Sequence, residues 1–134
     1  MAWFSFDWIG AMIMAYLIGS IPSAYVAGRL VKGKDIRDEG DRNPGAGNTY
    51  RTIGPKAGMV VGAIDIGKGA LAVLLARALT DGTGPQMAAG VVAIIGHNWP
   101  IFLKLRGGRG AASALGVFIA LVPIPAIPIS LVWL

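Results

Sequence analysis

The chain has 134 residues, of which 54% are hydrophobic and 14% are charged, and its net charge is +5. Soluble domains carry about 25% charged residues, so apolar segments that cross a bilayer best explain the deficit. The net charge does not indicate nucleic-acid binding, because the basic residues lie between apolar segments rather than along one face. The absence of cysteine excludes disulfides and thiolate chemistry. We therefore expect an all-α polytopic membrane protein, with residues 1–134 forming a single domain of about four transmembrane helices.

The first apolar segment covers about residues 8–30, which is long enough for a hydrocarbon core of roughly 30 Å. No basic region precedes it, so it is expected to be an anchor rather than a cleaved signal peptide. The run Gly19-Ser20-Ile21-Pro22-Ser23 interrupts its second half. Because Pro22 has no backbone donor, we expect a kink or a local irregularity there.

A long polar segment follows, at about residues 31–56, and it contains most of the acidic side chains. Its glycines allow a nest of backbone N–H groups that binds anions, and its arginines can each hold a phosphate through two hydrogen bonds. The residues concerned are Gly40, Gly45 and Gly47, with Arg37, Arg42 and Arg51. The alternative is an ordinary cytoplasmic loop that follows the positive-inside rule.

The second apolar segment, about residues 57–79, contains Asp65 and Lys68. Their i, i+3 spacing on a helix lets the two side chains face each other. A charge inside a membrane costs at least about 2.5 kcal/mol, so such residues usually mark function. The alternative is a self-neutralising pair that only orients this helix.

After a turn at residues 80–86, a third apolar segment covers about residues 87–103 and contains His97, the only histidine. It could act as a general base at neutral pH, or it could be a hydrogen-bonded anchor at the membrane interface. No histidine lies near Ser20 or Ser23 in the sequence to suggest a serine nucleophile. No cluster of His, Asp and Glu has metal-ligand spacing, so we expect no metal site.

Residues 104–110 form a basic, glycine-rich link, and Gly107-Gly108-Arg109-Gly110 immediately precedes the next apolar segment. The free N–H groups of a helix N-terminus there would favour an anion. The alternative is a tight turn with stop-transfer charges. From Ala111 the chain is apolar again, and its prolines after Val122 leave open one broken helix or a helix followed by a turn.

The basic residues also predict the orientation. The polar segments at 31–56 and 104–110 are rich in Lys and Arg, whereas the turn at 80–86 contains none. Since basic residues mark the cytoplasmic side, the N-terminus should lie outside and both glycine-rich segments should face the cytoplasm. Two such segments on one face favour phosphate binding over two ordinary loops.

Four pieces of the sequence, in this order, resemble the bacterial membrane acyltransferases that use acyl phosphate to acylate glycerol 3-phosphate. They are residues 19–25 with Arg29; Asp35-Ile36-Arg37 leading to Asn43, Gly45-Ala46, Asn48, Arg51 and Gly54; Asp65 with Lys68-Gly69; and residues 96–102 followed by 106–110. The resemblance implies transfer of a fatty acyl group to the 1-hydroxyl of glycerol 3-phosphate, giving lysophosphatidate, without a cofactor. Its expected setting is the bacterial cytoplasmic membrane, with the active site facing the cytoplasm.

The resemblance and the residue chemistry together predict a site. The expected catalytic residues are Ser20, Arg29 and His97. The expected phosphate-binding residues are Arg37, Gly40, Asn43, Gly45, Asn48, Arg51, Lys68, Gly107, Gly108 and Arg109. Glycerol 3-phosphate and acyl phosphate are the expected small-molecule partners, and the acyl chain is expected to lie between helices in lipid.

The chain departs from the family pattern in several places. Asp41 and Arg42 stand where the family has serine and glycine, Gly47 replaces a threonine, and Arg106 and Arg109 replace lysines. Family members also continue into further helices with a functional histidine and asparagine, so this chain is expected to be the N-terminal portion of a larger bundle or to need a partner chain. The alternatives are a non-catalytic relative that binds lipid phosphate or assembles with a partner, and a small transporter.

Overall fold

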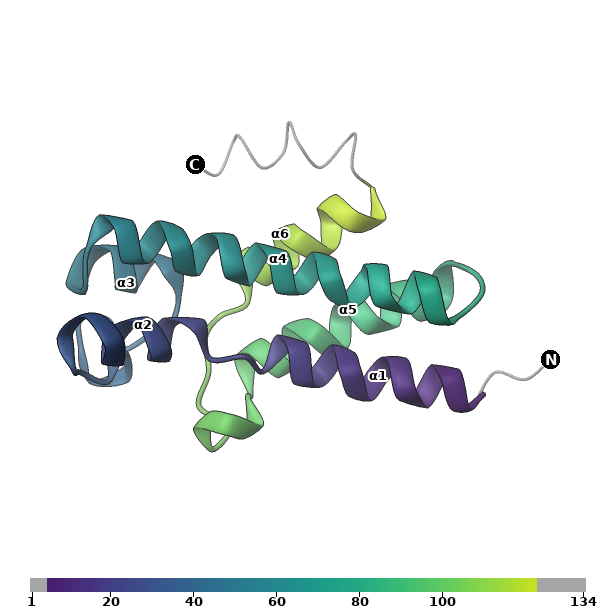
Figure 1. Cartoon of the computed structure of the whole chain (residues 1–134), viewed down its shortest axis with the longest axis horizontal. Helices are drawn as coiled ribbons and strands as arrows, with labels where there is room; N and C mark the ends of the chain where they lie inside the picture. Colours follow the sequence, from purple (N-terminus) through teal and green to yellow (C-terminus); the bar gives the residue numbers. More distant parts are fainter. Residues whose placement is uncertain (1–4, 123–134) are drawn as a thin grey trace.

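The computed structural model describes residues 5–122, and every regular element within this range is a helix (Figure 1). The elements are α1 (Phe6–Gly19), α2 (Ser23–Lys32), η1 (Ile36–Asp38), α3 (Ala46–Thr52), α4 (Pro55–Leu79), α5 (Thr83–Asn98), η2 (Ile101–Leu103) and α6 (Ala111–Leu121). In this part of the chain, three stretches are long and apolar enough to cross a membrane: Phe6–Lys32, Pro55–Leu79 and Thr83–Leu103. With the shorter apolar α6, they confirm the predicted all-α polytopic bundle.

The predicted segment boundaries are close to those observed. The second helix begins at Pro55 rather than near residue 57, because a proline is well suited to the first helical position. The third helix begins at Thr83, earlier than expected, and ends at Asn98 before a short 3₁₀ turn. Helix α6 ends at Leu121, and the path expected after Val122 lies outside the described residues.

The predicted irregularity near Pro22 is a complete break between α1 and α2. At the break the Ile21 carbonyl accepts hydrogen bonds from the Ser23 N–H at 3.0 Å and from the Lys68 Nζ at 2.9 Å. Interrupted helices are tolerated at membrane depth where other groups satisfy the freed backbone. Lys68 supplies that group here, so the break is tied to the middle of α4.

The long polar segment is folded, not an open loop. Its η1 and α3 pack against α2 and α4, and Ile36 and Ile53 are buried with Ala24 and Val61. The sequence did not predict α3, because glycine and asparagine are poor helix formers. Packing against α4 stabilises this short helix and holds the polar segment at one end of the bundle (Figure 1).

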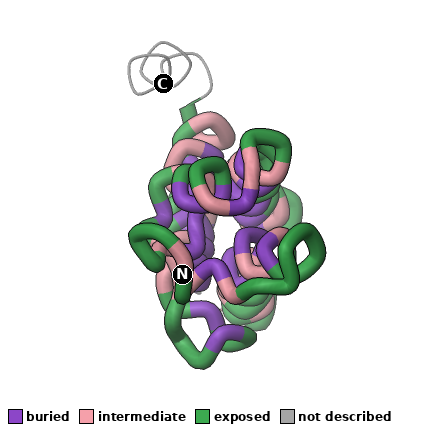
Figure 2. The backbone as a smooth tube through the Cα atoms, turned by 90° about the vertical axis from the view of Figure 1, so that its left-hand side faces the viewer, coloured by how far each residue is buried: buried purple, intermediate pink, exposed green. Residues whose placement is uncertain are grey.

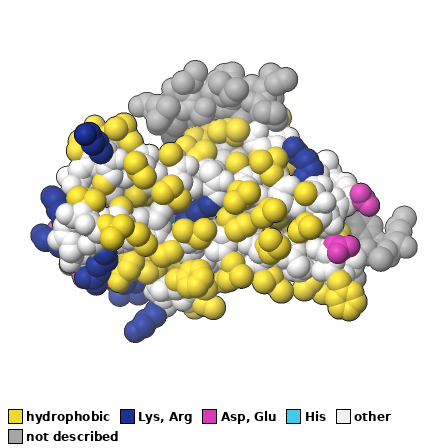
Figure 3. Space-filling view, in the orientation of Figure 1, with side chains coloured by type: hydrophobic (Ala, Val, Ile, Leu, Met, Phe, Trp, Pro, Cys, Tyr) yellow, Lys and Arg dark blue, Asp and Glu magenta, His cyan; other side chains and the backbone are white. Residues whose placement is uncertain are grey.

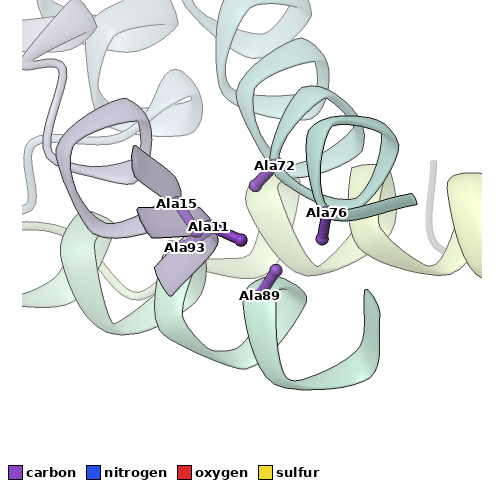
Figure 4. Close-up of a cluster of buried hydrophobic side chains, with 6 residues drawn as sticks. All are labelled: Ala11, Ala15, Ala72, Ala76, Ala89 and Ala93. Atoms are coloured by element: carbon purple, nitrogen blue, oxygen red, sulfur yellow. The ribbon is translucent and has the colours of Figure 1, made fainter. Parts of the chain in front are cut away.

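The helices pack through very small side chains. Figure 4 shows six buried alanines converging from three helices: Ala11 and Ala15 of α1, Ala72 and Ala76 of α4, and Ala89 and Ala93 of α5. Small residues let transmembrane helices approach closely, which is a main source of their association in lipid. In Figure 2 the buried residues accordingly lie on the inward sides of the helices, with exposed residues outside.

Glycines bring two pairs of helices into backbone contact. A Cβ at Gly19 of α1 would overlap the Ala93 carbonyl of α5, and a Cβ at Gly96 of α5 would overlap the Tyr16 carbonyl of α1. Helices α4 and α6 are in contact in the same reciprocal way. A Cβ at Gly69 of α4 would overlap the Ser113 carbonyl of α6, and a Cβ at Gly116 of α6 would overlap the Ile66 carbonyl of α4. Neither pair can accept a larger residue at these positions without moving a helix.

The surface agrees with a bilayer setting. Figure 3 shows hydrophobic side chains over the middle of the molecule, while most Lys and Arg side chains on this face gather at the end where α2 and α3 lie. Large apolar residues such as Ile13, Ile64 and Val91 are exposed on the long helices. Exposed aliphatic side chains on this scale are expected where lipid, rather than water, is the solvent.

Candidate active site

A narrow cavity lies where the helix break, the first polar segment and the glycine-rich link meet. Its walls come from five parts of the chain: residues 19–25, Pro44, Lys68, His97, and Pro100, Leu103, Gly107 and Gly108. The cavity has about 10 Å³ of room for the centre of a water molecule, which is close to the minimum for one bound water. The fold therefore brings Ser20, Lys68, His97 and the two glycines of the link together, although they are far apart in the sequence.

Asp65 lies at the centre of the polar groups beside this cavity. Its side chain is 1% exposed, and Oδ1 accepts a hydrogen bond from the Ser23 hydroxyl at 2.6 Å. The same oxygen lies 3.0 Å from Lys68 Nζ and 3.7 Å from His97 Nδ1. The predicted pairing of Asp65 with Lys68 is confirmed, and the structure adds Ser23 and His97 to it.

Ser20 presents a buried hydroxyl to the cavity. The residue is fully buried, and its Oγ has no hydrogen-bond partner. A buried polar group without a partner costs about 1–3 kcal/mol, so this hydroxyl is suited to a water molecule or a bound ligand. Ser20 is the C-cap residue of α1, and its hydroxyl does not make the bond to the preceding helical turn that Thr80, the C-cap residue of α4, makes to the Ala76 carbonyl.

The glycine-rich link forms one wall of the cavity, and it differs in detail from the prediction. The N–H groups of Gly107 and Gly108 donate to the carbonyls of Asn98 and His97, at 3.0 and 3.1 Å. These two groups are therefore already paired and not free for an anion. A Cβ at Gly108 would overlap His97 Nε2 and lie 3.1 Å from the Pro44 carbonyl. The glycine thus allows the two polar segments to meet at the imidazole.

In the first polar segment, several predicted phosphate ligands bind the chain itself. The buried Asn48 amide donates to the carbonyls of Glu39 at 2.9 Å and Ile36 at 3.4 Å, and its oxygen accepts from the Asp41 N–H at 3.3 Å. Gly40 leaves space for this amide, which a Cβ would overlap. Arg51 forms a 2.8 Å ion pair with Asp41. These residues shape the segment, and none of them lines the cavity.

Asp41 and Arg42 are two of the departures expected from the resemblance, and both have visible consequences. The Asp41 carboxylate also accepts a hydrogen bond from the Asn43 N–H at 3.0 Å, so it caps the turn that precedes Pro44. Arg42 adopts φ +64°, a left-handed conformation that costs a residue with a side chain roughly 1–2 kcal/mol. This backbone geometry explains why a glycine is suited to the position.

Two of the predicted arginines lie beside the ring of one tyrosine at the cavity wall. The guanidinium carbons of Arg29 and Arg37 each lie 5.3 Å from the centroid of Tyr25, which lines the cavity. Arg37 also donates to the Leu103 carbonyl at 3.1 Å and forms two hydrogen bonds with the Asp35 carboxylate. These bonds from the Arg37 side chain hold the pKa of Asp35 below its usual range. Arg29 is exposed and, like Arg109, does not line the cavity.

Sequence reasoning missed several residues of the cavity. Tyr25 and Pro44 were not among the candidates, and Ser23 was considered only as a hydroxyl near the helix break. Asp65, which lies beside the cavity, was considered only together with Lys68. The one available signal was the charge of Asp65 inside an apolar segment, because such a charge needs hydrogen-bond partners. Nothing in the sequence showed that a partner would be Ser23, which lies 42 residues away.

Known proteins resemble this chain over most of its length. A family profile described as "Glycerol-3-phosphate acyltransferase" matches residues 9–134. Glycerol-3-phosphate acyltransferase 2 of Moorella thermoacetica is 50% identical over 95% of this chain and 65% of the relative. Glycerol-3-phosphate acyltransferase 2 of Dehalococcoides mccartyi is 49% identical over 84% of this chain and 54% of the relative.

A solved structure has the same fold. The crystal structure of PlsY (YgiH), an integral membrane glycerol 3-phosphate acyltransferase, in its glycerol 3-phosphate form is 38% identical, with a TM-score of 0.87 over 94% of this chain and 63% of that one. The lysophosphatidic acid form gives a TM-score of 0.84 at 37% identity. The chain spans 65% and 54% of the two relatives above and 63% of the crystal structure. The resemblance predicted from the motifs is confirmed, and together with the apolar helices it indicates a multi-pass bacterial membrane protein. The chain belongs to the glycerol-3-phosphate acyltransferase family.

Proposed function

We propose that the protein transfers a fatty acyl group from acyl phosphate to the 1-hydroxyl of glycerol 3-phosphate, giving lysophosphatidate and phosphate. The observation that carries the proposal is the cavity that gathers Ser20, Lys68 and His97 under two basic, glycine-rich segments. Both substrates carry phosphate, which suits a cationic site. The family relationship supports the same reaction, since the related crystal structures are described as a glycerol 3-phosphate form and a lysophosphatidic acid form.

The proposed reaction is a single displacement at the acyl carbonyl. The 1-hydroxyl oxygen attacks the acyl carbonyl, the bond from that carbon to the phosphate oxygen breaks, and phosphate leaves. The hydroxyl proton goes to a base, for which His97 is the candidate at the cavity wall. Lys68 and the Ser20 hydroxyl are placed to stabilise phosphate oxygens or the negative charge that develops on the carbonyl oxygen.

The remaining predicted residues bind phosphate or hold the loops. Arg29 donates a hydrogen bond to the Tyr25 hydroxyl at 3.2 Å and is exposed, so its guanidinium is available to turn toward a bound phosphate. The cavity has room for only about one water, so admitting either substrate requires the two polar segments to separate. Arg37, Asn43, Gly45 and Arg109 belong to those segments, and we assign them to phosphate binding at the cavity mouth. We assign Gly40, Asn48 and Arg51 to shaping the first polar segment, through the contacts described above.

We propose further that the cavity opens toward the cytoplasm, with the N-terminus outside. The positive-inside rule supports this orientation. Because the chain has no cysteine, single cysteines report the topology directly. An Asp81→Cys variant is expected to react with a membrane-impermeant maleimide in intact cells, and a Lys104→Cys variant only after lysis. The reverse pattern would show that the orientation is inverted.

Ser20 offers a matched test of the proposed site. Ser20 and Ser113 are both fully buried serines whose Oγ atoms have no partner, but only Ser20 lines the cavity. Ser20→Ala is expected to lower the rate of lysophosphatidate formation in membranes by about 10- to 100-fold, as for one hydrogen bond to a charged group. Ser113→Ala should keep the full rate. The assay follows labelled glycerol 3-phosphate with acyl phosphate as the donor, and equal rates in the two variants would remove Ser20 from the site.

A second candidate function is a non-catalytic relative that binds phosphate esters. The observation in its favour is the Asp41–Arg51 ion pair, which occupies an arginine that would otherwise be free for a phosphate. If this function is correct, membranes with the protein bind glycerol 3-phosphate but yield no lysophosphatidate. Product formation above that of empty membranes decides for the enzyme.

A further inference from the structure

We propose that Asp65 is a positioning residue of the site: it fixes the Lys68 ammonium and sets which ring nitrogen of His97 carries the proton. This inference rests on the proposed acyl transfer for its kinetic test, but its spectroscopic test is independent of that reaction. The basis is the convergence of α2, α4 and α5 on one carboxylate through Ser23, Lys68 and His97.

The surroundings of Asp65 leave little freedom to its carboxylate. The side chain is 1% exposed and lies in α4, near the middle of a membrane-spanning stretch. Its Oδ1 is held by the Ser23 hydroxyl and by Lys68 Nζ, at 2.6 and 3.0 Å. A buried carboxylate stays charged only where its hydrogen bonds compensate for the loss of solvation. The carboxylate is therefore a fixed reference point between the helices.

The first consequence concerns Lys68. An ammonium has three N–H donors. One is directed to Asp65 Oδ1 at 3.0 Å and one to the Ile21 carbonyl at 2.9 Å. One donor is left for the cavity, which Lys68 lines. Because two acceptors from different elements fix Nζ, the direction of its remaining N–H is fixed too. Asp65 thus determines where this cation can meet a substrate oxygen.

The second consequence concerns His97. Its Nδ1 is buried without a hydrogen-bond partner and faces Asp65 Oδ1 at 3.7 Å, which is too long for a hydrogen bond. The second carboxylate oxygen, Oδ2, is also buried without a partner. A small approach of the ring would satisfy both groups. A carboxylate beside Nδ1 favours the tautomer with its proton on that nitrogen, which leaves Nε2 as an acceptor beside Gly108 and the cavity.

This arrangement matters for the reaction because a general base must present a lone pair to the hydroxyl that it deprotonates. With the proton on Nδ1, the lone pair of Nε2 is on the side of the imidazole where the two polar segments meet. A purely structural role of the ion pair between Asp65 and Lys68 requires no preference for either tautomer. The two roles can therefore be separated by observing His97 directly.

The spectroscopic test uses the fact that His97 is the only histidine. The NMR shifts of its two ring nitrogens distinguish the tautomers, and a labelled sample in lipid nanodiscs gives one set of signals. In the unsubstituted protein, we expect the proton of the neutral ring on Nδ1. In Asp65→Asn and Asp65→Glu, we expect the tautomer ratio to shift toward Nε2–H. A ratio unchanged in both variants, or a neutral ring with Nε2–H in the unsubstituted protein, would overturn the proposal.

The kinetic test compares the same variants with Asp81→Asn, which removes an exposed carboxylate from the turn after α4. We expect Asp65→Asn to lower kcat by at least about 10-fold, because displacement of a catalytic group by about 1 Å can cost about 100-fold in rate. Asp81→Asn should keep the full kcat. Asp65→Glu keeps the charge opposite Lys68 but moves the carboxylate by one methylene group. It therefore also covers the case in which Asp65→Asn does not fold.

Positioning predicts a lower kcat in Asp65→Glu, whereas a structural ion pair predicts an unchanged one. An unchanged kcat in Asp65→Glu would overturn the proposed role. If the unsubstituted protein forms no lysophosphatidate, the proposed function fails, and the tautomer measurement still decides the role of Asp65.

Discussion

Gly108→Ala is expected to lower the proposed acyl transfer strongly while the helix bundle stays folded. The new Cβ would overlap His97 Nε2 and press on the Pro44 carbonyl, so the two polar segments could no longer meet at the imidazole. Displacement of a catalytic group by about 1 Å can cost about 100-fold in rate, and we expect at least that loss in kcat. Assays of lysophosphatidate formation in membranes measure it.

Gly10→Ala is the matched control for this variant. Gly10 lies in α1, and a Cβ there would meet nothing within 4 Å. The Gly10→Ala protein should form lysophosphatidate at the same rate as the unsubstituted protein. It should unfold at the same temperature as that protein or slightly above. A Gly108→Ala protein with an unaltered rate would show that contact between the two polar segments at His97 is not needed for the reaction.

Gly69→Ala is expected to cause a large loss of stability, and Gly67→Ala, two residues earlier in α4, essentially none. At Gly69 the added Cβ would overlap the Ser113 carbonyl and lie 2.9 Å from its carbon. This obstacle is backbone, so α4 and α6 must separate, and overpacking of this kind costs about 1–3 kcal/mol. At Gly67 the Cβ would meet nothing within 4 Å.

Thermal unfolding in detergent, followed by circular dichroism, compares the two α4 variants. Gly67→Ala should unfold at the same temperature as the unsubstituted protein or a little above, because alanine stabilises a helix interior by up to about 1 kcal/mol relative to glycine. Gly69→Ala should unfold well below it. Equal unfolding temperatures for the two variants would show that the close contact of α4 with α6 does not limit stability.

The sequence predicted those features that depend on local chemistry. Pro22 lacks an N–H, so a break in the first span could be expected, and the structure confirms it. The spacing of Asp65 and Lys68 was sufficient to predict that they face each other, because a helix fixes that geometry. The polar segments were expected on one face from their charge, and Pro44 and Gly108 do line the same cavity.

Features that depend on distant contacts could not be predicted in this way. Helix α3 forms from residues of low helix propensity, because α4 supplies the surface on which it packs. The backbone N–H groups of Gly107 and Gly108 were expected to be free to bind an anion, but they donate to carbonyls at the end of α5. Asn48 looked like a phosphate ligand, yet its amide joins parts of its own segment. Each case was decided by a partner that local sequence does not reveal.

The reciprocal glycine contacts have a consequence for how this site can change over evolution. Three of these glycines are sequence neighbours of cavity residues: Gly19 of Ser20, Gly69 of Lys68, and Gly96 of His97. The distances between these side chains are therefore set by the separation of the helix axes. A substitution of a single side chain elsewhere cannot change that separation. Under the proposed function, changes in substrate preference should therefore arise from substitutions in the two polar segments. The glycines that set the spacing tolerate no exchange unless the opposing helix changes too.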